Sequence, residues 1–106
     1  MKLAVLAISA TAILLSSQPV AAEPYPPPDP SGFVSALRVQ GIAFADQNYI
    51  QSVGWAVCDA SQRGMTHAAV NQAVKASHYT DEEADHIIDK AVLFLCPSQM
   101  LAMTAR

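Results

Sequence analysis

Basic residues are scarce in this chain, and their scarcity argues against two classes of partner. Six Lys and Arg stand against nine Asp and Glu, which gives a formal net charge of −3 at pH 7. The basic residues do not cluster, whereas proteins that bind nucleic acid or anionic lipid surfaces carry basic patches. We therefore expect neither nucleic acid nor an anionic membrane surface as a partner.

The sequence also lacks motifs with the residue spacing of known catalytic or metal-binding sites. The chain has two cysteines and three histidines, with no CxxCH motif for covalent haem attachment and no metal-ligand spacing. No nucleophile is flanked by the glycines of an elbow motif, and the carboxylates gather at one helix start instead of forming an opposed pair. We predict that the protein is not an enzyme, binds no cofactor and holds no metal.

The N-terminal segment has the layout of a secretory signal peptide. One lysine precedes an apolar run over residues 3–15, and Val20-Ala21-Ala22 offers small residues for cleavage. The run is shorter than the roughly 20 residues of a membrane-spanning helix, although an uncleaved anchor is the alternative. We expect residues 1–22 to be removed after Ala22, which places the mature chain in the cell envelope or the extracellular space without a membrane span.

Residues 23–30 form a proline-rich segment, EPYPPPDP, with five prolines in eight residues. Proline fixes φ and lacks a backbone donor, so this segment is expected to be extended and not helical. A ligand for a proline-recognition domain is one interpretation. We favour a stiff spacer that precedes a helical domain over residues 31–106.

Hydrophobic periodicity and capping signals predict a compact all-α domain of four helices. Caps at Asp29, Asp46, Thr66 and Thr80 begin helices that end near Gly41, Gly64, Tyr79 and Pro97. Gly41 and Gly64 are expected to adopt the left-handed conformation that ends a helix. Gly54 lies inside the second helix, where it costs up to about 1 kcal/mol relative to Ala, so we expect another helix to approach closely there.

The segment from Thr80 to Pro97 is expected to be the central helix. It begins with a capping box, Thr80-x-x-Glu83, and continues with apolar residues at helical spacing. Its last turns are apolar all round, so we expect them to be enclosed. Cys96 has one intramolecular partner available, Cys58, and export allows the bond, although two free buried thiols are the alternative. The disulfide would close a loop of roughly 40 residues, worth about 3–4 kcal/mol.

Several short elements of the sequence have a spacing in common with a known family. They are Phe33-x3-Leu37-Arg38-x2-Gly41-Ile42, Val57-Cys58-Asp59, Gly64 and Ala91-Val92-x3-Cys96-Pro97. On these elements the chain resembles a family of small exported mycobacterial proteins, domain of unknown function 732, over about residues 30–97. The resemblance implies export from an actinobacterial cell, a helical fold and a bridged cysteine pair. It implies no activity.

Four residues are candidates for ligand binding: His78, Tyr79, His86 and Trp55. His78 and Tyr79 stand at a helix junction and offer two axial ligands for haem, with Trp55 as a pocket wall. His86 lies among acidic residues at the start of the last helix, where a metal site would need ligands from a second element. A haem or metal-ion carrier is therefore our second hypothesis. By default, we expect all three histidines, His67 included, to lie on the surface.

Apolar and aromatic residues are abundant for so short a chain. Met100, Leu101 and Met103 are expected to form one more turn that packs back onto the domain. Together with Tyr49 and Trp55, these residues either complete the core or leave a surplus that forms a groove or a homodimer face. We predict a non-catalytic binding or interaction module, whose partner is an unknown protein or an apolar small molecule.

Overall fold

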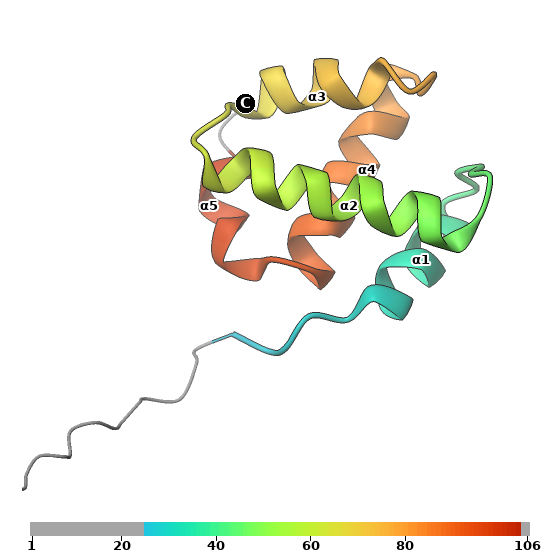
Figure 1. Ribbon diagram of the computed structural model, residues 1–106, viewed down its shortest axis with the longest axis horizontal. Coiled ribbons are helices and arrows are strands. Elements are labelled where there is room, and N and C mark those ends of the chain that lie inside the picture. Colours follow the sequence, from blue (N-terminus) through green and yellow to red (C-terminus); the bar gives the residue numbers. More distant parts are fainter. Residues whose placement is uncertain (1–24, 105–106) are drawn as a thin grey trace, which may run out of the picture.

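The computed structural model describes residues 25–104, which form six consecutive helical segments (Figure 1). They are α1 Pro30–Val39, α2 Gln47–Gln62, α3 His67–Lys75, α4 Asp81–Phe94, the 3-10 helix η2 Pro97–Gln99 and α5 Met100–Thr104. The described residues contain no strand. The all-α prediction is confirmed, with four main helices and a short fifth. The predicted signal peptide, residues 1–22, and the first two residues of the spacer lie outside the described residues.

The central position of α4 is also confirmed, because every other helical segment contacts it. Ala84, Ile87, Ile88 and Ala91 of this helix have no exposed surface. Figure 1 shows α4 behind α2, with α1 towards one end of the domain and α5 towards the other. One helix therefore supplies the middle of the core, and the others cover it.

Each main helix starts at the cap that the sequence predicted. The side chains of Asp29, Asp46 and Thr66 accept hydrogen bonds from the backbone N–H three residues further on. At α4 the capping box is complete. The Thr80 hydroxyl accepts from the Glu83 N–H, and the Glu83 carboxylate accepts from the Thr80 N–H. Hydrogen bonds within one turn therefore fix these four starts.

Glycines end two of the helices, as the sequence predicted, and a histidine takes the same conformation after a third. Gly41 and Gly64 have φ angles of 77° and 91°, as expected for left-handed stops. After Gly41, the N–H of Ile42 donates to the Leu37 carbonyl at 3.1 Å and the Ile42 side chain is buried. No glycine follows α3, and His78 takes the left-handed conformation there, with φ 74°. Histidine is among the few side chains that tolerate this region.

The predicted disulfide is present and joins α2 to the chain just beyond α4. Cys58 is bonded to Cys96, with 6.0 Å between their Cα atoms. The two residues are only 4% and 7% exposed. The bond therefore lies inside the domain and ties its middle to its C-terminal part.

The C-terminal end of the fold differs from the prediction. Met103 packs into the core, but Met100 and Leu101 are exposed. Leu93, in the last turn of α4, is 48% exposed, so the expectation that this turn is enclosed is wrong for that residue. The reason is the length of α5, whose five residues are too few to cover every side of α4.

Candidate functional site

Exposed apolar side chains gather where α4 ends and α5 packs against it. Leu93 belongs to the last turn of α4, and Met100 and Leu101 begin α5; all three are exposed. Phe94, next to Leu93, is partly buried against the core. We call these four residues the C-terminal apolar surface. Contiguous exposed apolar side chains of this kind mark interaction sites.

Three shallow grooves run across this surface. The first has a volume of ≈ 270 Å³ and is lined by Asp89, Lys90, Val92, Leu93, Met100, Met103 and Thr104. The second, of ≈ 560 Å³, lies between residues 26–29 and the end of α4 at Leu93 and Phe94. The third, of ≈ 310 Å³, is lined by Tyr25 and by residues of η2 and α5. Leu93 lines the first two grooves and Met100 lines the first and third, so the three adjoin one another at these side chains.

The described part of the proline-rich segment belongs to this surface. The backbone N–H of Asp29 donates to the carbonyl of Phe94 at 2.7 Å. Pro26, Pro27 and Pro28 line the second groove. The segment therefore lies along the end of α4 as well as leading to α1.

The first groove connects the core with solvent. Val92 and Met103 are 3% and 2% exposed, so they form its floor. Its rim carries three polar side chains, Asp89, Lys90 and Thr104, and the Thr104 hydroxyl donates to the Leu101 carbonyl at 3.0 Å. Such a groove can receive an apolar body together with a polar end.

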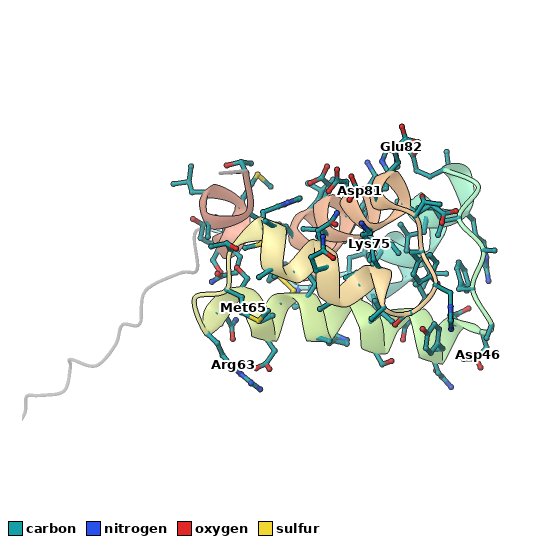
Figure 2. The ribbon with its side chains drawn as sticks, turned by 90° about the horizontal axis from the view of Figure 1, so that it is seen from above. Asp46, Arg63, Met65, Lys75, Asp81 and Glu82 are labelled. Atoms are coloured by element: carbon teal, nitrogen blue, oxygen red, sulfur yellow. A yellow bond between two sulfur atoms is a disulfide. The ribbon has the colours of Figure 1, made fainter. Side chains whose placement is uncertain are left out.

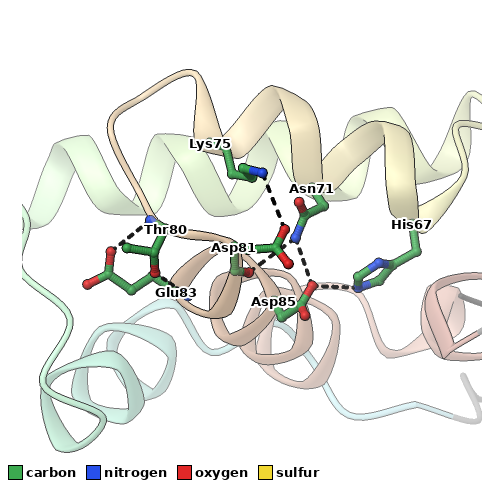
Figure 3. A network of polar contacts seen from close by, with 7 residues as sticks. All are labelled: His67, Asn71, Lys75, Thr80, Asp81, Glu83 and Asp85. Atoms are coloured by element: carbon green, nitrogen blue, oxygen red, sulfur yellow. Dashed lines mark hydrogen bonds and ion pairs between the residues drawn. The ribbon is translucent and has the colours of Figure 1, made fainter.

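A second candidate site is a polar pocket between α3 and α4, where side chains of the two helices contact one another (Figure 3). The Asn71 amide donates to the Asp85 carboxylate at 2.8 Å and to the Asp81 carbonyl at 3.3 Å. The Lys75 ammonium lies 3.5 Å from the Asp81 carboxylate. Figure 2 shows Lys75 and Asp81 close together, whereas Glu82 points away from α3. These contacts join α3 to the start of α4.

His67 is the buried member of this pocket. The residue is 4% exposed, so the expectation that all three histidines lie on the surface is wrong for it. Its Nε2 lies 3.5 Å from Asp85 Oδ1 but makes no hydrogen bond within the described part of the chain. The position follows from the fold, because His67 is the first residue of α3 and α3 packs on α4.

Comparison with known families matches a large part of the chain. The family described as "Protein of unknown function (DUF732)" matches residues 28–98. The chain belongs to the DUF732 family. This confirms the resemblance seen in the sequence, and the matched residues include α1 to α4 and both cysteines. No curated protein and no solved structure gave a significant match.

The DUF732 match ends inside η2, so α5 lies beyond it. The C-terminal apolar surface therefore combines two parts of the chain. Leu93 and Phe94 come from the matched domain, and Met100 and Leu101 come from the residues that follow it. The disulfide at Cys96 holds the junction between the two parts in place.

The four residues predicted to bind a ligand lie elsewhere in the DUF732 domain. His78 and His86 are exposed, and Trp55 is 41% exposed on α2. The Tyr79 hydroxyl donates to the Ala43 carbonyl at 3.1 Å. None of the four lines the three grooves or the polar pocket. Tyr49, which was expected beside Trp55 at an interaction surface, is exposed but lines none of them either.

Metal or haem binding, the second hypothesis, stays untested. Within residues 25–104, no three or more His, Cys, Asp or Glu side chains are grouped so that they could hold a metal ion. The Tyr79 hydroxyl has a structural partner, and burial raises the pKa of Tyr79 above its usual value of 10.0, with Tyr49 and Glu83 acting in the same direction. This side chain is therefore held as a neutral phenol that fastens the α1–α2 connection.

Sequence reasoning missed Lys90 and Leu93 as a pair. The two lie three residues apart on α4, so they share one side of the helix. A signal was present, since the last turns of this helix are apolar all round. That signal was interpreted as burial, whereas an exposed apolar strip beside a lysine fits it equally well.

Proposed function

We propose that the protein is a non-catalytic binding module that takes up an apolar small molecule at the C-terminal apolar surface. One observation carries the proposal: Leu93, Met100 and Leu101 are exposed and line three adjoining grooves. Leaving these side chains in water forgoes roughly 25 cal/mol for each Å² of apolar surface that a ligand would cover. A ligand that covers them recovers that free energy.

The shape of the first groove supports a small molecule as the ligand. Small-molecule sites are concave, mainly apolar and furnished with a few polar groups, with volumes of about 300–1,000 Å³. The first groove, of ≈ 270 Å³, is slightly smaller than this range, but it has an apolar floor that reaches the core and polar groups only at its rim. The adjoining grooves extend the space available to a longer ligand.

The setting that we propose is the cell envelope or the extracellular space. Disulfides form and persist in oxidising compartments, so the Cys58–Cys96 bond supports a setting outside the cytoplasm. None of the helices that the structure describes has the length and apolar character for crossing a membrane. The predicted signal peptide, residues 1–22, agrees with this setting.

The non-catalytic role is supported by the use of the polar side chains. Asp81 and Asp85, two carboxylates of the cluster at the start of α4, both contact residues of α3. The other acidic residues of the first turn of α4 lie at the positive end of the helix dipole, where negative charge is stabilising. Packing and helix electrostatics therefore account for this carboxylate cluster.

A neutral fluorescent probe, N-phenylnaphthylamine, tests the proposed function. The wild-type protein is expected to bind it with increased emission, and the Leu93→Gln/Met100→Gln variant is expected to lose at least about tenfold in affinity. Val39→Gln is the matched control, because Val39 is 86% exposed on α1 and lines none of the grooves. Two results would contradict the proposal: no binding of the probe to the wild type, or equal affinities of the Leu93→Gln/Met100→Gln and Val39→Gln variants for the probe.

A further inference from the structure

The charge at the mouth of the first groove points to the kind of molecule that fits it. Lys90 is the one Lys or Arg of α4, and it lines the groove together with Leu93 and Met100. No ion pair joins Lys90 to another described residue. A cation therefore stands beside an apolar groove without a charged partner in residues 25–104.

We propose that the ligand is a single-chain amphipathic anion, with its chain in the groove and its charged end on the Lys90 ammonium. This inference rests on the proposed function and names the chemistry of its ligand. A carboxylate, phosphate or sulfate on such a chain has the same recognition chemistry, which is an anion that accepts charge-assisted hydrogen bonds from Lys90.

The position of Lys90 suits this role. It lies three residues before Leu93, so both side chains occupy the same side of α4. Lys90 is partly buried. Lysine covers apolar surface with its methylene groups and keeps its ammonium in water. The ammonium thus ends at the rim, where the head of a ligand seated on Leu93 would emerge.

The other groups at the rim restrict where the anion can lie. Asp89 also lines the groove and takes part in interactions of its own. A carboxylate offers an anion no attraction, so the charged end of the ligand lies on the Lys90 side. The Thr104 hydroxyl donates to the Leu101 carbonyl, so its proton is already engaged. Among the residues 25–104 that line this rim, Lys90 is therefore the group that attracts a negative charge.

Two ligands with the same chain and different heads test the inference. Dodecanoate and dodecanol are each titrated, below the concentration at which they aggregate, against the wild-type protein loaded with N-phenylnaphthylamine. Dodecanoate is expected to displace the probe at a concentration at least about tenfold lower than dodecanol, since a hydrogen bond to a charged group is worth more than a neutral one. Lys90→Gln is expected to abolish this difference while it retains binding of the probe.

Two further variants complete the design. Arg63→Gln is the control, because Arg63 is an exposed cation at the end of α2 that lines none of the grooves. It is expected to keep the wild-type preference for dodecanoate. Asp89→Asn is the second control, at the rim itself: it is expected to keep the preference for dodecanoate, because Lys90 and not Asp89 is assigned to the anion.

The outcomes separate this inference from the function on which it rests. Equal displacement by dodecanoate and dodecanol overturns the anionic ligand and leaves the apolar site intact. A preference for dodecanoate that survives in Lys90→Gln shows that another group binds the anion, and overturns the role of Lys90. Failure of the probe and of both ligands to bind overturns the proposed function and this inference together.

Discussion

The ring of Phe33 lies directly against the backbone of Gly54, with no space for a side chain between them. A Cβ atom added to Gly54 would come within 2.8 Å of ring atoms Cε2 and Cζ of Phe33, and within 2.7 Å of Leu95 Cδ1. The close approach that the sequence predicted at this glycine is confirmed. Both α1 and the end of α4 pack closely against Gly54, which lies one turn before the disulfide-bonded Cys58.

Gly54→Ala is expected to destabilise the domain by about 1–3 kcal/mol, because the added methyl group must displace the buried Phe33 ring or Leu95. The helix propensity gained, up to about 1 kcal/mol, offsets part of that cost. Urea unfolding followed by circular dichroism measures the difference. Ser52→Ala, at an exposed position of the same helix, should stay within about 0.5 kcal/mol of wild type. If Gly54→Ala were as stable as the wild type, α1 could move away from α2 to make room for the methyl group at no cost, which would contradict this prediction.

Removal of the disulfide is expected to cost about 4 kcal/mol of unfolding free energy. The bond spans a sequence separation of 38 residues, and its loss releases the loop-closure entropy of the unfolded chain. The measurement compares the wild type with the Cys58→Ala/Cys96→Ala variant by urea unfolding. Because both sulfurs are buried, mild reductant should open the bond of the native protein no faster than the domain itself opens. Rapid reduction without unfolding would contradict this picture.

The stability of the domain is expected to fall at alkaline pH through Tyr79. Burial raises the pKa of Tyr79 in the folded state, so the folded state holds this proton more tightly than the unfolded state. This contribution is complete below the unfolded pKa of about 10 and is lost as the pH rises through the folded pKa. Tyr79→Phe should lose about 0.5–1.5 kcal/mol at neutral pH with the hydrogen bond to Ala43. It should then show a smaller decline on going to about pH 11.

The matched control for this prediction is Tyr25→Phe. Tyr25 is an exposed tyrosine within the proline-rich segment, and its side chain makes no hydrogen bond to a described residue. Its replacement should leave both the neutral stability and the alkaline decline as in the wild type. If the unfolding free energy of Tyr79→Phe fell at alkaline pH as much as that of the wild type, groups other than Tyr79 would cause the fall.

Asp85→Ala is expected to lower the unfolding free energy by about 1–3 kcal/mol, because it leaves the buried Asn71 amide without one acceptor and removes the carboxylate beside His67. Asp85→Asn keeps an acceptor oxygen and should lose less. Amide hydrogen exchange in α3 reports the effect locally, with faster exchange expected in the alanine variant. His86→Ala, at an exposed position of α4, is the control and should leave exchange in α3 unchanged. Unaltered exchange in Asp85→Ala would show that this contact does not hold α3.

The sequence by itself determined most of the local structure. Helix starts at Asp46, Thr66 and Thr80 and stops at Gly41 and Gly64 were predictable, since each depends on hydrogen bonds and φ angles within a single turn. The pairing of the two cysteines was predictable because each had one partner available. The central role of α4 followed from its apolar residues at helical spacing.

Only the tertiary structure decided which side chains stay in water. Leu93 is exposed and His67 is buried, although the opposite was expected of both. A side chain is covered or left open by helices that are distant in sequence, and periodicity within its own helix does not encode how far they reach. The shortness of α5 leaves Leu93 uncovered, and the packing of α3 on α4 encloses His67. The candidate site exists for the same reason, because it is the part of α4 that no other helix of the described chain is long enough to cover.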